Sequence, residues 1–182
     1  LSVLAFSQSI STAQKVDELI KQMTIEEKVG QLTQYSGKWD ATGPISIKHN
    51  TQKEIISGQI GSMLNVLGST YTRQYQELAM QSRLKIPLLF AQDVIHGFKT
   101  TFPIPLAEAA SWDLKAMERS ARIAATEAAA SGTHWTFAPM VDISRDPRWG
   151  RVMEGAGEDP YLGSKIAYAR VKGFQGNKIG DL

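Results

Sequence analysis

The sequence predicts an α/β fold, because short apolar strands alternate with amphipathic helices along most of its length. Strands are expected at 60–66, 86–93 and 134–142, with helices at 69–84 and 113–131 between them. Apolar strands separated by helices are typical of a parallel sheet covered by helices. Two architectures share this pattern, an open doubly wound sheet and a closed (β/α)8 barrel. A full barrel takes roughly 250 residues, so 182 residues with three to four strand-helix units predict a partial (β/α)8 barrel if the sheet is of this type.

Two further helices are expected before the first of these strands. The first begins at Lys15, and its apolar residues follow the helical spacing i, i+3, i+4 and i+7: they are Val16, Leu19, Ile20 and Met23. Thr24 and Glu27 have the spacing of a capping box, which predicts the start of the second helix. That helix is expected to bury its apolar stripe, Ile25, Val29 and Leu32. Residues 36–50 are expected to form a loop.

The later helices show equally clear signals. Helix 69–84 places Tyr71, Tyr75 and Leu78 on one face. Helix 113–131 is rich in alanine and is expected to stop at Gly132. A last helix is predicted after the cap formed by Asp159 and Pro160. It would carry Leu162, Ile166 and Ala169 on one side.

Composition excludes several classes of function. The net charge is +2 with acids and bases interspersed, so no nucleic-acid or membrane-surface partner is expected. The absence of cysteine excludes disulfides and thiolate metal sites. No apolar stretch approaches the ~18–20 residues of a membrane span. Residues 1–14 are interpreted as a signal-peptide remnant or a disordered terminus, the former implying export, and 15–182 as the folded part.

Two polar clusters follow predicted strands, where active sites of α/β proteins lie. In the first, "AQDVIHG" at 91–97, Asp93 could cap a turn or accept hydrogen bonds from neighbouring hydroxyls of a ligand. His96 precedes a glycine in a turn and could equally be a packed residue. The other histidines have no partners at metal-ligand spacing and no H-E-x-x-H occurs, so neither a metal site nor a cofactor is predicted.

The second cluster is the stretch 142–162, "DISRDPRWGRVMEGAGEDPYL", which has no apolar period and is expected to be a surface loop. Its three arginines recur around Trp149 and resemble a grip on phosphate. Five acidic residues outnumber them, giving +3 − 5 = −2, which disfavours a polyanion. Mixed charges beside an aromatic ring suit a neutral, hydroxyl-rich ligand such as a sugar. Pairing of arginines with carboxylates to stiffen the loop remains the alternative.

Five segments together resemble the first half of the catalytic domain of glycoside hydrolase family 3, and most closely the periplasmic β-glucosidases. They are, in order, "KVDELIKQMTIEEKVGQL", "SRLKIPLLFAQDVIHG", "TTFPIPLAEAASWD", "FAPMVDISRDPRWGRVMEGAGEDPYLG" and "VKGFQG". The resemblance covers nearly everything from Lys15 onward. It implies a (β/α)8-type barrel and exo-acting, retaining hydrolysis of β-linked sugars such as glucosides, in the periplasm or outside the cell.

The resemblance also implies roles for single residues. Asp93 matches the aspartate of A-x-D-x-x-H-G, and Arg151 the last arginine of W-G-R; both bind sugar hydroxyls in the family. The remaining matched positions are interpreted as shaping the site: His96, Arg148, Trp149, Glu154, Glu158 and Asp159. The family's nucleophile and acid/base lie downstream of Leu182, so no catalytic residue is assigned and this chain alone is expected to hydrolyse nothing.

Two other functions stay open from the residues themselves. A non-catalytic carbohydrate-binding module would use the same grip without the pair of carboxyl groups, about 5–5.5 Å apart, that retaining hydrolysis needs. A phosphate-binding α/β protein would show binding that weakens steeply with salt. Neither sugar preference nor oligomeric state follows from the sequence.

Overall fold

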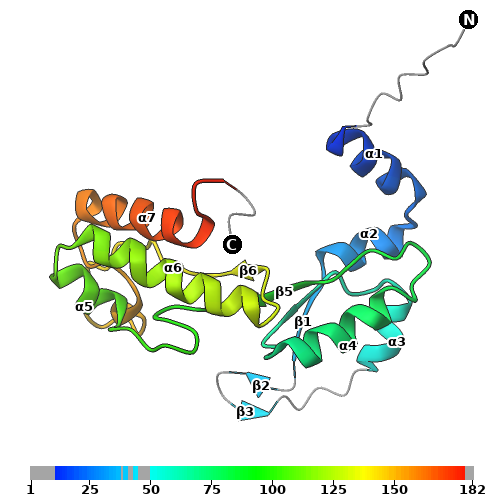
Figure 1. The fold of residues 1–182 in the computed structure, drawn as a ribbon, viewed down its shortest axis with the longest axis horizontal. Coiled ribbons are helices and arrows are strands. Elements are labelled where there is room, and N and C mark those ends of the chain that lie inside the picture. Colours follow the sequence, from blue (N-terminus) through cyan, green and yellow to red (C-terminus); the bar gives the residue numbers. More distant parts are fainter. Residues whose placement is uncertain (1–10, 38, 41–42, 45–49, 179–182) are drawn as a thin grey trace, which may run out of the picture.

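The computed structural model describes residues 11–37, 39–40, 43–44 and 50–178. Its parallel strands are β1 (Gln34–Ser36), β4 (Ser62–Leu64), β5 (Leu89–Gln92) and β6 (Trp135–Thr136), and β2 (Trp39–Asp40) pairs with β3 (Gly43–Pro44) in a small antiparallel ladder. The helices are α1 (Thr12–Gln22), α2 (Ile25–Leu32), α3 (Thr51–Ile56), α4 (Ser69–Ala79), α5 (Pro105–Ala110), α6 (Leu114–Ala130) and α7 (Pro160–Gln175), with a 3₁₀ turn at Val152–Glu154. Figure 1 shows the sheet between α2, α3 and α4 on one side and α5, α6 and α7 on the other.

The four-stranded sheet decides between the two architectures. Its order is β1-β4-β5-β6, and every neighbouring pair is parallel. In a doubly wound sheet the order of the strands reverses at a switch point. Here each new strand pairs with the strand of this sheet that precedes it in the chain. Right-handed crossovers between sequential parallel strands place the connecting helices, such as α4 between β4 and β5, on the same face of the sheet. The α/β prediction is therefore confirmed, and the sheet is part of a barrel.

The first core lies between this sheet and α3 and α4. Tyr35, Met63 and Phe90 are aligned across β1, β4 and β5, and they pack with Ile55 of α3 and Ala79 of α4. Because strand side chains alternate between faces, the neighbouring residues point to the opposite face. Leu89 on that face is 51% exposed.

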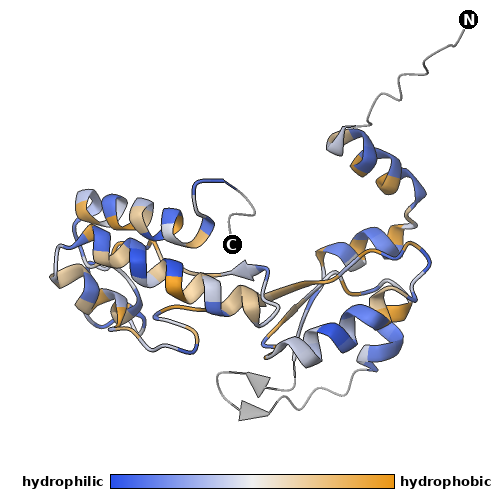
Figure 2. Ribbon diagram, in the orientation of Figure 1, coloured by the Kyte–Doolittle hydropathy of each residue, from blue (hydrophilic) through white to orange (hydrophobic). Residues whose placement is uncertain are grey.

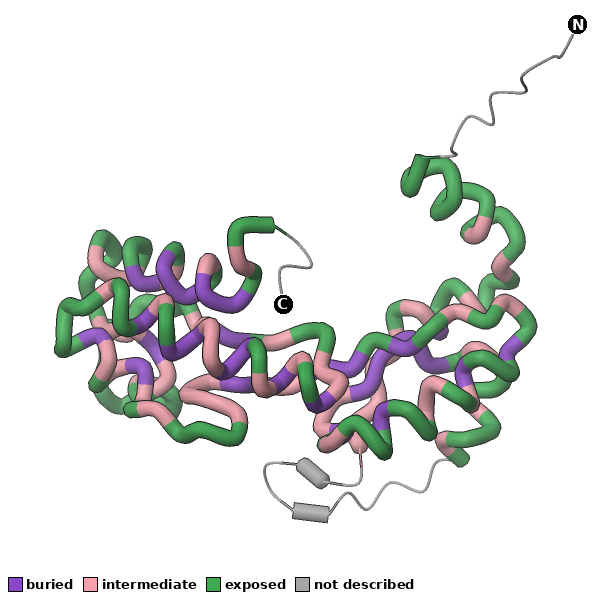
Figure 3. The backbone as a smooth tube through the Cα atoms, in the orientation of Figure 1, coloured by how far each residue is buried: buried purple, intermediate pink, exposed green. Residues whose placement is uncertain are grey.

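The second core joins α6 to α7. The buried residues of this core that lie on the two helices are small or aromatic: they are Ala121, Ala124, Ala125, Ala128 and Phe174. Ile166 and Ala169 of α7 are also buried, as its apolar spacing predicted. Figure 3 shows the buried residues of the two helices where they face each other.

The apolar stripe of α2 corrects one prediction. Ile25, Val29 and Leu32 are 76%, 57% and 89% exposed instead of buried. The buried residue of α2 is Gly30, on the opposite side of the helix, where an added Cβ would clash with the carbonyl oxygen of Gly58. The close backbone approach at this glycine turns the apolar stripe away from the core.

Helix α1 begins at Thr12, three residues before the expected start, and holds no buried residue. Residues 1–10 of the predicted leader segment lie outside the described residues. The capping box of Thr24 and Glu27 is confirmed, with both reciprocal hydrogen bonds present. None of the described helices is long and apolar enough to cross a membrane.

Three other segments differ in part from the prediction. The predicted strand 134–142 is regular only at β6, and Pro139 interrupts it because proline lacks the N–H that a ladder needs. Tyr75 and Leu78 pack on the core as predicted, whereas Tyr71, in the first turn of α4, is 56% exposed. The loop predicted at 36–50 contains β2 and β3, and part of it lies outside the described residues.

Candidate sugar-binding site

Asp93 follows β5 directly, at the carboxyl edge of the sheet. Its side chain is exposed, and its backbone carbonyl accepts a hydrogen bond of 3.2 Å from the hydroxyl of Thr136 at the end of β6. Val94 next to it adopts a left-handed conformation with φ of 44°. The chain therefore turns sharply after β5, and the loops after β5 and β6 leave the sheet side by side.

His96 is half-buried in this turn and bonded to its far end. Its Nδ1 lies 3.1 Å from the carbonyl oxygen of Phe102, and its own carbonyl accepts from the amide of Phe102 at 2.8 Å. Gly97 has φ of 112°, and a Cβ there would clash with the carbonyl oxygen of Thr100. The glycine after His96 is thus required by the shape of the turn.

The loop 142–162 is stiffened by its own charge pairs. Arg148 forks onto Asp146, with its Nη2 2.6 Å from Oδ2, and Arg151 forks onto Glu154, with its Nη2 2.5 Å from Oε2. Asp159 caps α7 by accepting from the amide of Leu162 at 2.8 Å. The loop is also closed on itself by the amide of Ser144, which donates to Gly157 at 3.0 Å.

Electrostatic interactions connect the cluster at 91–97 with the loop 142–162. The hydrogen bond that Arg151 donates to Glu154 is the main cause that raises the pKa of Arg151, and the charges of Glu154, Asp93 and Asp142 raise it further, against the lowering effect of burial. The hydrogen bond from Arg151 is likewise the main cause that lowers the pKa of Glu154, and His96 contributes to the same lowering. Asp93 is thus within electrostatic range of Arg151, and His96 within range of Glu154, at the carboxyl edge of the sheet.

The other predicted residues lie in the loop 142–162. Arg148 pairs with Asp146 and Asp159 caps α7, so both residues hold the loop. The side chain of Arg148 is nevertheless 89% exposed. Trp149 is 38% exposed, and Glu158 is exposed just before the cap. Within the described ranges, no group of three or more potential ligands is placed to hold a metal ion.

Two contributors carried no separate signal in the sequence. Asp142 counted only as one loop charge, yet it acts electrostatically on Arg151. Glu127 of α6 accepts hydrogen bonds from the amides of Lys99 and Thr100 at 2.7 and 2.8 Å, and also from the Thr100 hydroxyl. Nothing in an alanine-rich helix marks Glu127 as the anchor of a distant loop.

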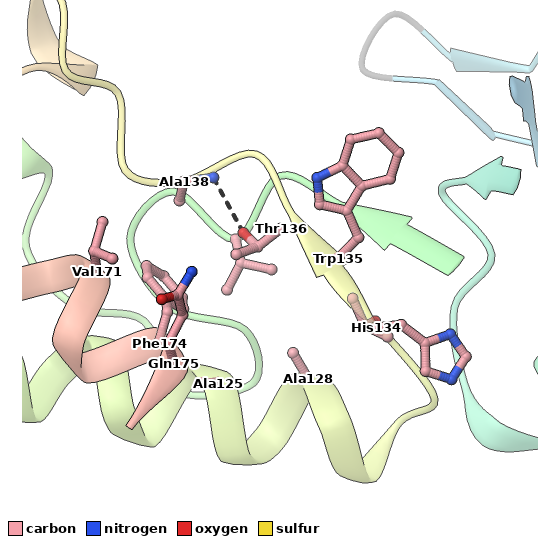
Figure 4. A pocket seen from close by; sticks show the side chains of 11 residues that line it. Ala125, Ala128, His134, Trp135, Thr136, Ala138, Val171, Phe174 and Gln175 are labelled. Atoms are coloured by element: carbon pink, nitrogen blue, oxygen red, sulfur yellow. Dashed lines mark hydrogen bonds between the residues drawn. The ribbon is translucent and has the colours of Figure 1, made fainter. Parts of the chain in front are cut away.

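A separate groove of about 460 Å³ runs beside β6. It lies between β6, α6 and α7, and none of the eight predicted site residues lines it. Figure 4 shows Thr136, whose Oγ1 accepts from the amide of Ala138 at 3.1 Å, between the indole of Trp135 and the side chains of Val171 and Phe174. Its lining is mainly apolar, unlike the charged group at Asp93 and Arg151.

Comparison with known proteins places these residues in a family. The family model for the glycosyl hydrolase family 3 N terminal domain matches residues 24–181. The periplasmic beta-glucosidase of Salmonella typhimurium is 47% identical over 167 residues, covering 91% of this chain and 21% of that protein. The probable beta-glucosidase C of Aspergillus flavus is 33% identical over 190 residues, covering 92% of this chain and 30% of that protein.

Solved structures agree with these relatives. The beta-glucosidase of Listeria innocua in complex with isofagomine has a TM-score of 0.80 and 43% identity, covering 92% of this chain and 23% of that one. The beta-N-acetylhexosaminidase of Beutenbergia cavernae has a TM-score of 0.70 at 20% identity and covers 87% of this chain, which supports the fold alone. The chain thus spans roughly a fifth to a third of the length of the relatives at 30% identity or more described here.

Proposed function

The chain belongs to glycosyl hydrolase family 3, and on this premise we propose that it supplies the sugar-binding part of an exo-acting, retaining β-glucosidase. The substrate would be a β-linked glucoside or oligosaccharide. Residues 15–182 would form the N-terminal portion of the barrel domain. The name of the Salmonella relative supports a periplasmic or secreted location.

The observation that carries this proposal is the hydrogen bond from Thr136 to the Asp93 carbonyl, which joins the ends of β5 and β6 where the loops that carry Asp93 and Arg151 begin. The charge of Asp93 also acts on Arg151. A carboxylate accepts from sugar hydroxyls and a guanidinium donates to sugar oxygens, so the pair can bind one sugar ring from two sides. Glu154 holds the guanidinium of Arg151 in place. Hydrogen bonds from such a prepared grip lower the barrier when they strengthen in the transition state.

We propose that the nucleophile and the acid/base belong to residues outside this chain. Retaining hydrolysis needs two carboxyl groups about 5–5.5 Å apart. Two carboxylates of the loop 142–162 are instead bound to arginines: Glu154 to Arg151 and Asp146 to Arg148. The 182-residue chain is therefore expected to bind sugar without hydrolysing it.

The test is the β-glucosidase activity of the gene product extended to its natural stop codon. Asp93→Ala and Arg151→Ala should each lower kcat/KM by about 10- to 150-fold, because each removes a charge-assisted hydrogen bond worth roughly 1.5–3 kcal/mol. Arg145→Ala is the matched control, since it removes an exposed arginine of the same loop that has no hydrogen bond or ion pair among the described residues. Unchanged kcat/KM in Asp93→Ala and Arg151→Ala would contradict the assignment of the site.

The 182-residue chain is assayed beside the extended protein. Turnover by the purified chain would refute the downstream position of the catalytic groups. An extended protein that binds glucose without cleaving β-glucosides would favour the carbohydrate-binding module instead.

A further inference from the structure

A buried arginine of α7 reaches the turn that carries Asp93. The side chain of Arg170 is only 4% exposed, and it divides between two acceptors from different parts of the chain. Nη1 donates to Glu108 Oε2 of α5 at 2.6 Å, and Nη2 donates to the backbone carbonyl of Ile95 at 2.6 Å. Ile95 lies between Asp93 and His96.

The environment of Arg170 makes this arrangement costly. Burial lowers the pKa of Arg170, and the charge of Glu108 offsets only part of that effect. The Nε atom is buried and has no partner among the described residues. The space that Arg170 shares with His96, Phe102 and Glu108 has no room for a water molecule. A buried ion pair is often no more stabilising than apolar residues of similar volume.

Packing between α5 and α7 does not need this ion pair. Ala109 of α5 and Ile166 of α7 already share one buried apolar cluster with Met117 of α6. The Nη2 contact is different in kind, because it fixes a backbone carbonyl inside a sharp turn. The far end of the same loop is held by Glu127, which accepts from the amides of Lys99 and Thr100. The turn is thus anchored from α7 on one side and from α6 on the other.

We propose that Arg170 is a positioning residue for the turn 93–96, acting through the Ile95 carbonyl to hold the carboxylate of Asp93 against the sugar. This inference rests on the proposed sugar-binding role of Asp93. Loss of the Nη2 contact leaves a buried carbonyl without its donor, and the turn relaxes to find another one. A displacement of about 1 Å at a binding group can cost on the order of 100-fold in rate.

The test uses the full-length gene product with Arg170→Met, Asp93→Ala and the control Lys172→Met. Lys172 lies two residues further along α7 and pairs with Glu118 of α6 at 3.1 Å, so its change removes the same charge and an ion pair from the same helix without touching the turn. Each variant is assayed with p-nitrophenyl β-glucoside and with analogues that each lack a single hydroxyl group. The hydroxyl whose removal no longer matters in Asp93→Ala identifies the group that Asp93 binds.

Arg170→Met should lower kcat/KM for the glucoside by roughly 10- to 100-fold and reduce the penalty for losing that same hydroxyl. Lys172→Met should keep the wild-type penalty. A general loss of stability would lower activity on all the substrates equally, so the hydroxyl-specific change separates positioning from folding. If Arg170→Met keeps the wild-type penalty, the inference is overturned while the proposed function stands.

A second variant covers the case in which Arg170→Met does not fold. Arg170→Lys retains the charge beside Glu108 but not the forked geometry of the guanidinium. Arg170→Lys should also reduce the penalty in kcat/KM for losing the hydroxyl that Asp93 binds, though by less than Arg170→Met. If Arg170→Lys keeps the wild-type penalty for that hydroxyl, the inference is overturned. If Asp93→Ala leaves every hydroxyl penalty unchanged, the proposed role of Asp93 fails and the positioning role falls with it.

Discussion

At the scale of single residues, two arginines with similar spacing and similar partners have different surroundings. Arg148 and Arg151 each fork onto a carboxylate two or three residues away. The Arg148 side chain is 89% exposed, whereas Arg151 is 54% exposed and interacts with the charges of Asp93 and Asp142. Spacing alone does not separate them, because one of these charges, Asp93, lies 151 − 93 = 58 residues earlier in the chain.

The pairing of Arg151 with Glu154 predicts a pH dependence. The hydrogen bond from Arg151 lowers the pKa of Glu154 below its ordinary value of 4.5. A carboxyl group with a lowered pKa contributes its stabilisation above that ordinary value and loses it as pH falls through the folded-state pKa. The alignment of the Arg151 guanidinium should therefore be intact at neutral pH and be lost below about pH 4.5.

Glu154→Gln in the full-length gene product isolates this effect. The ratio of kcat/KM between wild type and Glu154→Gln should exceed one near neutral pH and fall toward one in acid, because protonated Glu154 resembles glutamine. Taking the ratio cancels the other groups that titrate in both proteins. A ratio that stays constant from neutral pH down to the most acidic pH at which both proteins stay folded would contradict the role given to this pair.

At the scale of elements, α6 and α7 are brought together by a glycine. A Cβ added to Gly173 would clash with the carbonyl oxygen of Glu118 and lie 2.7 Å from the Cβ of Ala121. Close contact between the helix backbones places α7 so that Arg170 reaches Ile95. The position of α7 against α6 therefore depends on a glycine, Gly173.

Gly173→Ala should lower the free energy of unfolding by about 1–3 kcal/mol, the usual cost of overpacking. Gly163→Ala on the same helix is the matched control. Its added Cβ would lie 3.2 Å from the flexible end of Ile143, and alanine is favoured over glycine in a helix by ~1 kcal/mol. Urea unfolding of both variants measures the difference, and equal stability of the two variants would show that this contact is not tight.

Elements with strong local patterns were predicted, and those defined by distant contacts were not. The capping box of α2 and the apolar side of α7 follow from short-range spacing. Strand β1 has the sequence Gln-Tyr-Ser, which shows no strand pattern, and it is a strand because it pairs with β4. The wrong burial of the α2 stripe has the same origin, since a helical period identifies an apolar face but not its partner.

The candidate site divides in the same way. The sequence motifs predict Asp93 and Arg151 as sugar-binding residues, and that role stays a prediction; in the structure the charge of Asp93 acts on Arg151. The anchors of the turn could not be predicted, because Glu127 and Arg170 lie on helices whose patterns describe packing only. Polar contacts from a helix to a distant loop leave no period in the sequence.

At the scale of the whole molecule, the described chain has two apolar surfaces that its own elements do not cover. One is the α2 stripe, where Leu32 is 89% exposed. The other is the edge at β6, beside the 460 Å³ groove. There the ring centroids of Trp135 and Phe137 lie 4.8 Å apart, and the two residues are 44% and 37% exposed. Figure 2 shows apolar residues continuing along β5 toward this edge. A short strand with one unpaired side and exposed aromatic rings favours association.

The 182-residue chain alone should therefore self-associate, and its apparent mass in light scattering should rise with concentration. Leu32→Glu should weaken that rise without reducing stability, because the side chain it replaces is almost fully exposed. Gln22→Glu adds the same charge at an exposed position of the neighbouring helix and removes no apolar area, so it separates the effect of charge from that of the stripe. Some association should persist in Leu32→Glu, since the edge at β6 is unchanged. A chain that stays monomeric across the concentration range would mean that these two surfaces are too small or too separated to bind a second copy.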